Sequence, residues 1–512
     1  MTLFLSNSKR LVGLATLAAT VSIASFAPAA GLYYGDRGVR PLGRAGAFIA
    51  GGDDLGAIAY NPAGIYEAGG QVLMDGAWVH FTSDYSRQAL IQQTDPNTGL
   101  PVGGTVQTFA PVKGKTPFLP IPTLAVSFQV HPKWVIALGV FTPYAALPTY
   151  PSADDFKGKS TAEIASGSPQ RYSLITLDGS VLAVLAAGAA FAPTKEWRLG
   201  VTAGMLTGKF DTTVAFSGCI PERFLCAQES PSWDVLTRLD VGPIFAPYGS
   251  LGAVWIPDPK WRIGVSSQLP IYVRASATLK TRLPATPIFE NAKQVGEDAD
   301  VAFDLPWNVR IGVETRVIDH LRLELGGAFE RWSMHDSIRM TPLGISLQDV
   351  ALLPRNLIIP AIALQRHFQD SASVRLGGEY GFAIENIPLT ARAGVSYESS
   401  AIPKEYLSVL TLDAGKVTTA VGASMKIGKV RFDLTYAHLF AFDTTVDPKE
   451  AKITQVSPVN ANPPKNPDHI NGGVYSQRAD VLGMGLAYTF DPALTGEPAA
   501  VEPRVSDPKV KE

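Results

Sequence analysis

The sequence has no excess of charge of either sign. Its 512 residues include 44 Lys and Arg against 46 Asp and Glu, which gives a formal net charge of −2. A nucleic-acid-binding protein would normally carry a clustered basic excess, so this class is excluded. Only 18% of the residues are charged, below the roughly 25% of an average soluble domain, whereas 46% are hydrophobic. This composition argues against bulk disorder.

The sequence also lacks the motifs of common catalytic and metal sites. It contains no nucleophile elbow, and the nearest approach to a phosphate-binding loop, at 158–160, has Ala153 where the motif requires its first glycine. The 7 His residues show no metal-ligand spacing. We therefore expect no enzyme activity, no cofactor and no bound metal.

The N-terminus has the features of a secretory signal peptide. Lys9 and Arg10 precede an apolar stretch, and small residues at 27–29 form a cleavage-like site. We predict that residues 1–29 are removed and that the mature chain starts near Ala30; an uncleaved membrane anchor is the alternative. After this stretch, no run approaches the ~20 apolar residues that a membrane-spanning helix needs. An exported chain of this kind can cross a membrane only with strands.

The middle and C-terminal parts of the chain alternate between apolar and polar residues. Between Trp307 and Val317, one face is almost entirely apolar and the other is polar or small. A period of two is typical of strands with one apolar face. The same pattern recurs at 321–326, 373–382 and 430–436. A soluble β-sandwich would show it too, so alternation alone does not separate the two classes.

The lengths of the connections do separate them. Six short polar turns alternate with seven much longer connections rich in Pro, Gly and Asn. Thirteen connections join fourteen strands, and short turns on one side with long loops on the other are typical of bacterial outer-membrane barrels. We predict an all-β fold, a fourteen-stranded antiparallel transmembrane β-barrel over 71–490 with both termini in the periplasm. The short turns lie at 131–133, 193–195, 257–259, 318–320, 384–386 and 427–429, and the long connections at 86–120, 148–170, 217–235, 282–300, 341–361, 403–415 and 447–472.

Tryptophan placement and strand length agree with a membrane position. Trp134, Trp197 and Trp261 each follow a short turn by one or two residues, which predicts an aromatic girdle at the membrane boundary. A general preference of Trp for strands is the alternative. The strand from Trp197 to Phe216 would rise roughly 45 Å at ~3.3 Å per residue and ~45° tilt. Because the apolar band is only ~25 Å tall, we expect the wall to project above the outer surface.

Residues 30–70 do not alternate and consist mainly of small side chains. Asp54 is placed to cap a short helix over 55–60, which Pro62 would end. A fourteen-stranded barrel is too wide for side chains alone to fill, so this segment is predicted to plug the lumen. Residues 491–512 contain little apolar content and are predicted to form a disordered periplasmic tail. Charged residues on the lumen side are expected to pair with one another or with the plug, and these are Arg310, Glu314, Arg316, Arg322 and Glu324.

Motifs in the plug and in the strands resemble the long-chain fatty-acid transporter (FadL-like) family of outer-membrane proteins. Gly43-Arg44-Ala45, Asp53-Asp54 and Asn61-Pro62-Ala63-Gly64 resemble the N-terminal hatch of that family. The resemblance extends over 30–490, and it implies a fourteen-stranded barrel closed by a hatch over 30–70. Further motifs are Leu305-Pro306, Glu330-Arg331-Trp332-Ser333, Leu376-Gly377-Gly378-Glu379-Tyr380, Ala391-Arg392-Ala393-Gly394-Val395, Pro403-Lys404-Glu405-Tyr406 and Leu434-Thr435-Tyr436-Ala437-His438.

The resemblance implies passive uptake of hydrophobic molecules, foremost long-chain fatty acids, and their lateral release into the lipid of the outer membrane. It assigns the gate to the hatch motif at 61–64 and to a kinked third strand, which here includes Phe141, Pro143 and Tyr144. Proline cannot donate to a strand ladder, so Pro143 is the physical candidate for the kink. The alternative is that Pro143 merely ends the strand. Ala145 stands where the family often has glycine. We expect a monomer.

For the ligand carboxylate, the resemblance implies basic residues late on the fifth and ninth strands. Arg339 matches the ninth-strand position, whereas the fifth strand has Thr207 there and offers Lys209 as the nearest cation. Alternation from Trp197 turns Lys209 outward unless a bulge intervenes. Both cations could instead be solvated charges at loop edges, and a single cation would leave room for a neutral ligand such as an aromatic hydrocarbon. A general porin and a surface adhesin are further alternatives for an exported barrel.

The two cysteines fall within one predicted external connection. They are Cys219 and Cys226. Because the export route is oxidising, a disulfide is favoured over free thiols. Such a bond would close a short loop and would have no chemical role.

Overall fold

The computed structural model describes most of the predicted barrel. The predicted signal peptide, Cys219, Cys226 and nearly all of the predicted tail lie outside the described residues. No helix within the described ranges is long and apolar enough to span a membrane. The described residues are 37–94, 101–116, 120–144, 149–151, 174–176, 180–218, 233–284, 286–410, 412–454 and 469–491.

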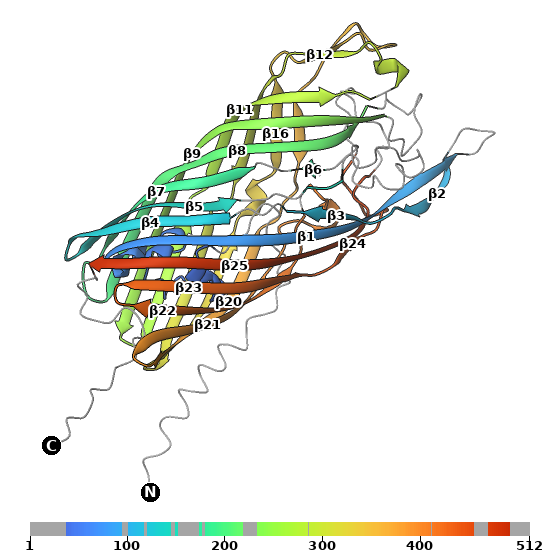
Figure 1. Cartoon of the computed structure of the whole chain (residues 1–512). Helices are drawn as coiled ribbons and strands as arrows, with labels where there is room; N and C mark the ends of the chain where they lie inside the picture. The colour runs from blue at the N-terminus through green and yellow to red at the C-terminus, as the bar shows by residue number, and fades with distance from the viewer. Residues whose placement is uncertain are drawn as a thin grey trace, which may run out of the picture.

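Fourteen antiparallel strands form a closed barrel, as the count of connections predicts (Figure 1). Closure comes from the first and last strands, which pair from Gly70 and Asp491 to Arg87 and Gly473. In order around the wall, the strands are β1 (Gly70–Thr94), β4 (Pro120–His131), β5 (Trp134–Tyr144), β7 (Val181–Phe191), β8 (Trp197–Ser217), β9 (Asp234–Asp258), β10 (Trp261–Gln268) continued by β11 (Ile271–Arg282), β13 (Asp298–Leu305) with β14 (Asn308–Ile318), β15 (Leu321–Glu330) with β16 (Ser337–Pro342), β19 (Ile362–Gln365) with β20 (Ser371–Ile384), β21 (Ile387–Glu398), β22 (Lys416–Ile427), β23 (Val430–Ala441) and β25 (Gly473–Asp491).

All six predicted short turns are present as tight connections between paired strands. The long connections contain more regular structure than their composition predicts. β1 continues to Thr94 and pairs with β2 (Pro101–Thr108), so much of 86–120 is a projecting hairpin (Figure 1). β12 (Lys293–Val295), β17 (Ser346–Gln348) and β18 (Asn356–Ile358) form a separate three-stranded sheet.

The short elements of the structure lie in the loops and at the N-terminal end of the described chain. The remaining strands are β3 (Val112–Lys115), β6 (Leu174–Thr176) and β24 (Thr444–Val446), and the helical turns are α2 (Val39–Leu42), η1 (Leu55–Ala59), η2 (Pro62–Gly64), α3 (Ile65–Ala68), η6 (Pro287–Phe289), η7 (Trp332–Met334) and η8 (Lys404–Tyr406).

The outer surface next to the short turns carries the predicted tryptophans. Trp134, Trp197 and Trp261 are each 43–44% exposed, and Trp255 joins them at 40%. The Trp197 and Trp255 rings stack at 6.0 Å between centroids. Amphipathic rings prefer the boundary between water and hydrocarbon. These residues therefore mark the membrane edge on the short-turn side.

Four neighbouring strands of the wall are divided into a lower and an upper part. The breaks lie at 269–270, 306–307, 331–336 and 366–370. Pro270 stands at the first break, and Pro306 at the second, where proline removes a ladder donor. We call β11, β13, β16 and β19 the upper tier, because they continue the wall beyond β10, β14, β15 and β20, away from the short turns.

The N-terminal segment lies inside the barrel (Figure 1). Every residue from Arg37 to Gly69 is buried, including its charged residues. We call Arg37–Gly69 the interior segment. Its helical turns contact the inner faces of strands on both sides of the wall, including β4, β5, β7, β8, β9, β22 and β23.

Candidate ligand pocket and interior segment

Two helical turns of the interior segment, η1 and η2, begin with side-chain caps. Asp54 Oδ1 accepts a hydrogen bond from Gly56 N at 2.9 Å, as its position before η1 predicts. Asn61 repeats the arrangement one turn later, because its Oδ1 accepts from Ala63 N at 3.1 Å and Pro62 occupies the first turn of η2. Such caps satisfy amide groups that a helix start leaves unpaired. They give a short segment with few long side chains a defined shape.

The motif at 61–64 lies directly against the barrel wall at two glycines, where the wall presents no side chain. Asn61 Nδ2 donates to Ala253 O of β9 at 3.2 Å. A Cβ on Gly252 would overlap Asn61 Oδ1, and a Cβ on Gly200 of β8 would overlap the Pro62 carbonyl group. Gly200 and Gly252 are paired with each other in the β8–β9 ladder. Glycine is thus required at both positions for this close approach of two backbones.

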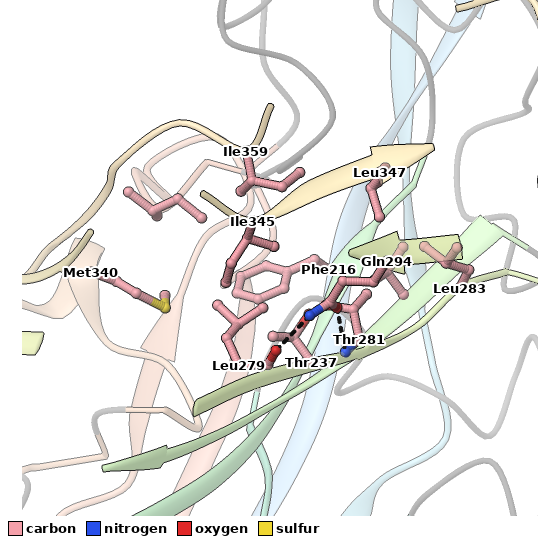
Figure 2. Close-up of a pocket in the computed structure, with 12 residues that line it drawn as sticks. Phe216, Thr237, Leu279, Thr281, Leu283, Gln294, Met340, Ile345, Leu347 and Ile359 are labelled. Atoms are coloured by element: carbon pink, nitrogen blue, oxygen red, sulfur yellow. Dashed lines mark hydrogen bonds between the residues drawn. The ribbon is translucent and has the colours of Figure 1, made fainter. Parts of the chain in front are cut away.

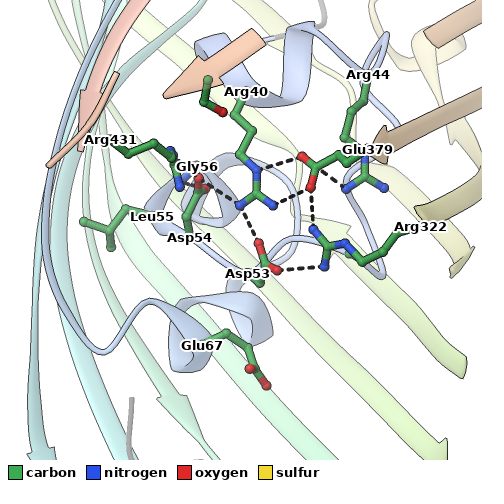
Figure 3. Close-up of polar contacts among 12 residues, drawn as sticks. Arg40, Arg44, Asp53, Asp54, Leu55, Gly56, Glu67, Arg322, Glu379 and Arg431 are labelled. Carbon is green, nitrogen blue, oxygen red and sulfur yellow. Dashed lines mark hydrogen bonds and ion pairs between the residues drawn. The ribbon is translucent and has the colours of Figure 1, made fainter. Parts of the chain in front are cut away.

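A buried cluster of charged residues joins the interior segment to one side of the wall (Figure 3). Arg40 pairs with Asp53 and also binds Glu379 of β20. Arg322 of β15 contacts Asp53 at 2.7 Å and Glu379 at 2.6 Å. Arg431 of β23 reaches Asp54 at 2.6 Å. Each charge has an opposite charge beside it, as buried ionic groups require.

A second group of charges holds the next turn of the interior segment. Arg44 Nη2 lies 2.9 Å from Glu314 and 3.1 Å from Glu324. Glu324 Oε1 also accepts hydrogen bonds from the backbone amides of Ile49 and Ala50, at 2.6 and 3.1 Å. Arg310, Glu314, Arg322 and Glu324 therefore contact the interior segment, as their alternation predicts. Arg316 forms no ion pair within the described part of the chain.

The opposite side of the interior segment meets an apolar wall. β4, β5 and β7 contain no Asp, Glu, Lys or Arg. Ile58 packs against Gly139 of β5, and Ile65 packs against Gly188 of β7. The interior segment is therefore fixed by ion pairs along β14–β23. Its Glu67 also pairs with Arg198 of β8 at 3.0 Å and with Arg262 of β10 at 3.2 Å. It touches β4, β5 and β7 without any ion pair.

The predicted gate residues of β5 lie at an irregularity of the ladder. Pairing of β4 with β5 ends at Phe141, and the register between β5 and β7 shifts between Phe141 and Tyr144. Pro143 lies in this shift and is buried. Phe141 is fully buried, and its ring meets the Tyr248 ring edge-on at 5.8 Å. This aromatic pair connects the inner face of β5 with that of β9.

An apolar pocket lies inside the upper tier, on the side of the long loops (Figure 2). Its polar lining consists of Thr237, Thr281 and Gln294. Gln294 is committed to the backbone, because it accepts from Thr281 N at 2.9 Å and donates to Leu279 O at 2.7 Å. The cavity volume is about 20 Å³, roughly the room of one water molecule. The apolar lining residues are Phe216, Val235, Leu279, Leu283, Met340, Ile345, Leu347, Ile359 and Ile362.

The two cations predicted to bind a carboxylate do not meet in this pocket. Arg339 is exposed on β16, whereas its neighbours Ile338 and Met340 are buried. Lys209 is exposed on β8 at a bulge in the pairing with β9. Sequence alternation places Lys209 correctly, but the register of the upper tier turns Arg339 away from the lumen. Neither residue is therefore positioned to hold the polar end of a ligand in the pocket.

A closed barrel with an apolar outer surface ringed by tryptophan, and a charged lumen filled by its own N-terminal segment, defines an outer-membrane β-barrel. Residues 20–490 match the model of one family of such barrels, the outer membrane protein transport protein family (OMPP1/FadL/TodX). The chain belongs to this family, whose members transport hydrophobic compounds across the outer membrane.

Solved structures share the fold. A FadL homologue from Pseudomonas aeruginosa has a TM-score of 0.65 at 14% identity, over 90% of this chain and 100% of its own. The Pseudomonas putida toluene transporter TodX has a TM-score of 0.57 at 15% identity, over 90% and 100%. The monoaromatic hydrocarbon channel CymD has a TM-score of 0.53 at 13% identity, over 89% and 98%. None of the curated proteins compared with the chain matches it.

Proposed function

We propose that this transporter takes up long-chain fatty acids passively, with the tail in the upper-tier pocket and the carboxylate on Arg366. The choice of ligand rests on the buried side chain of Arg366. It lies in the link between β19 and β20 and is only 7% exposed. Its Nε is buried without a hydrogen-bond partner, and no carboxylate in the described part of the chain pairs with its guanidinium.

An unpaired buried guanidinium is costly, because the charge has left water without gaining a partner. Burial lowers the pKa of Arg366 to about 10, so the group still carries its charge at neutral pH. It also acts on the nearby imidazole of His335, whose pKa is lowered to about 4 by burial and by the positive charge of Arg366. A ligand carboxylate would supply the anion that this corner of the lumen lacks.

The position of Arg366 suits an elongated amphiphile. Ile362, Leu364 and Arg366 share the inward face at the end of β19, whereas the residues between them are exposed. Ile362 lines the pocket, and Arg366 follows it by roughly 13 Å at about 3.3 Å per residue. An alkyl chain could therefore extend from the guanidinium into the pocket. Because the cavity is small, its apolar side chains must move apart to admit the tail.

Aromatic hydrocarbons are the second candidate ligand. The pocket lining contains no charged residue, which suits a neutral molecule as well as an alkyl tail. Two of the similar solved structures, TodX and CymD, are described as a toluene transporter and a monoaromatic hydrocarbon channel. A hydrocarbon would leave the charge on Arg366 unpaired, and this difference separates the two candidates.

We further propose that the ligand passes the interior segment on its apolar side and leaves near Pro143. The ion pairs hold the segment to β14–β23 and, through Glu67, to β8 and β10. The contacts of Ile58 and Ile65 with β5 and β7 are therefore the ones that can part at least cost. At about 0.8 kcal/mol per buried CH₂, a sixteen-carbon tail gains on the order of 10 kcal/mol in an apolar site. Release therefore needs a second apolar environment, which the bilayer beside β5 provides.

The experiment compares binding of palmitate and hexadecanol to the purified barrel in lipid nanodiscs. Wild type should bind palmitate more tightly, because only palmitate can pair with Arg366. Arg366→Gln should weaken palmitate binding by about 10-fold or more and leave hexadecanol binding unchanged. Arg366→Lys should retain part of the preference. Arg339→Gln is the matched control, since Arg339 lies opposite Ala363 on the neighbouring strand and faces outward.

Equal binding of palmitate and hexadecanol by wild type would remove the fatty-acid proposal. Tight binding of toluene with no preference for palmitate would favour the hydrocarbon. The change in gel mobility when the sample is heated shows whether each variant has formed a closed barrel.

A further inference from the structure

The wall has a second irregularity, between β9 and its neighbours β10 and β11. The lower part of β9 pairs with β10 up to Ser250 and Gln268, and the upper part pairs with β11 from Val241 and Ala277. Between these limits, 242–249 and 269–276 form no ladder pairs with each other, although the register on both sides is the same. At the lower end, Leu269 N still donates to Gly249 O at 2.9 Å. We call this stretch the seam.

The seam is not a frayed edge, because both strands are paired on their far sides. Within it, β9 pairs with β8 from Ile244 to Gly249, and β11 pairs with β13 from Ile271 to Ser276. The interruption is therefore confined to one line between two strands that are otherwise part of continuous sheets.

The direction of the side chains explains why the ladder cannot form. Residues opposite each other in an antiparallel ladder point to the same face of the sheet. Continuing the register from below puts buried Ala246 opposite exposed Tyr272, and exposed Phe245 opposite buried Val273. β9 and β11 are thus out of phase by one residue along the seam. A one-residue slip turns every side chain to the wrong face, so the two strands cannot pair without reversing one of them.

Prolines remove donors in the same stretch. Pro243 and Pro247 lie in β9, and Pro270 lies between β10 and β11. Proline is confined to the edges and interruptions of sheets because it has no amide hydrogen. The opposed side-chain directions of β9 and β11 and the prolines in this stretch therefore both prevent ladder pairs in the seam.

The seam lies at the height of the outer half of the bilayer. Gly249 and Gly242 are six and thirteen residues beyond Trp255 of the girdle, or roughly 14 and 30 Å higher at ~3.3 Å per residue and ~45° tilt. The apolar band of such barrels is ~25 Å tall. Unpaired strand edges are avoided at this depth unless they line a passage or are covered by protein.

Both faces of the seam are largely apolar. The charged exception is Arg274, which is exposed on the outer surface and pairs with Asp304 of β13 at 2.8 Å. Phe245, Leu269 and Tyr272 are each more than half exposed on the outer surface. On the inner surface, Tyr248 contacts the Phe141 ring of β5. The other buried side chains on the lumen side of the seam are Ile244, Ala246, Ile271 and Val273.

We propose that the seam between β9 and β11 parts to form a lateral passage for the hydrophobic ligand between the lumen and the outer leaflet. This proposal rests on the proposed function, since it gives the transported molecule a route. Parting the seam breaks no ladder pairs, whereas parting any fully paired neighbours would break several. The passage and Pro143 lie on opposite sides of β7, β8 and β9. The Phe141–Tyr248 contact links β5 to β9 on the lumen side.

The test locks the seam with a reversible bond. Phe245→Cys with Tyr272→Cys places two outward-facing thiols across it, in a chain that also carries Cys219→Ser and Cys226→Ser. The control is Leu251→Cys with Ser267→Cys, a directly opposed pair in the intact β9–β10 ladder. Initial uptake of radiolabelled palmitate, and separately of toluene, is measured in cells before and after reduction with dithiothreitol. A short bismaleimide on the same thiols applies the constraint wherever the disulfide does not form.

The seam lock should slow uptake roughly tenfold, equivalent to about 1.4 kcal/mol on the barrier, and reduction should restore it. The control lock should leave uptake unchanged. Unchanged uptake in a fully cross-linked seam would overturn the passage while leaving the proposed function intact. Absence of palmitate and toluene uptake in the unlocked parent, with a normally assembled barrel, would overturn both.

Discussion

Arg40 and Glu379 form a two-point ion pair inside the barrel, with Arg40 Nε 2.8 Å from Glu379 Oε1 and Arg40 Nη2 2.8 Å from Glu379 Oε2. Glu379 also binds Arg322 at 2.6 Å and Arg392 at 2.8 Å. One carboxylate of β20 therefore joins a guanidinium of the interior segment to guanidiniums of β15 and β21. Glu379 thus connects the interior segment and one side of the wall through a continuous network of ion pairs.

Glu379→Gln should loosen the interior segment. The substitution leaves three buried guanidiniums short of an anion, and breaking a buried pair costs about 3–5 kcal/mol. We expect a lower temperature for the shift in gel mobility and larger single-channel conductance, because water and ions gain access past the segment. Glu297→Gln is the control, since its pair with Lys280 is exposed at both ends and contributes at most about 1 kcal/mol. Equal conductance of the two variants would contradict the anchoring role.

Gly252→Ala should displace the motif at 61–64 from the wall. The added Cβ would overlap Asn61 Oδ1, so Asn61 must give up its hydrogen bonds to Ile49 O and Ala253 O. Leaving buried polar groups unpaired costs about 1–3 kcal/mol. Limited proteolysis should then cut the interior segment faster than in wild type. Gly76→Ala in β1 is the control, because a Cβ there meets nothing within 4 Å; if both variants resist protease like wild type, the close fit is not important.

The sequence predicts the barrel well because its signals are local. Alternation, six short turns and the girdle tryptophans each depend on neighbouring residues, and together they give the correct strand number. The inward charges at Glu314 and Glu324 follow from the same alternation. The cap at Asp54 follows from another local signal, the preference of aspartate for the position before a helix. What alternation does not reveal is the partner of each charge, since Arg44 and Glu324 are joined only when the chain folds back into the lumen.

The upper tier is where sequence reasoning fails, and the reason is register. Short strands separated by breaks can each change phase, so the face that a residue occupies no longer follows from its distance to the last turn. Arg339 is turned outward for this reason, and Arg366 inward. The seam arises from the same effect, because it needs two strands whose phases disagree. The signal in the sequence for this interruption of the ladder is the pair of prolines, Pro243 and Pro247, within one strand.

Asp413 should make the loop before β22 sensitive to pH. It is buried beside Glu398 and Lys416, and burial raises the pKa of Asp413 to about 7. Its folded pKa lies above the unfolded value of ~3.9, so its contribution to local stability is full below about pH 4 and is lost as pH rises through about 7. Protease should therefore cut residues 399–416 faster at pH 8 than at pH 5.

Asp413→Asn should abolish that difference, because an amide does not titrate. Glu450→Gln should keep it, since Glu450 is an exposed carboxylate in a neighbouring loop, paired with Lys404. A pH response that survives in Asp413→Asn would assign the effect to another group.

Pro143→Val should close the irregularity between β5 and β7 and slow ligand release. Valine restores an amide donor and favours strand conformation, so the ladder can continue past Phe141 toward Tyr144. We expect slower uptake of palmitate with unchanged binding, because the pocket and Arg366 lie elsewhere in the lumen. Pro388→Val is the control, since Pro388 lies in β21 opposite Ala383 in an uninterrupted ladder. Normal uptake in an assembled Pro143→Val barrel would rule out release at β5.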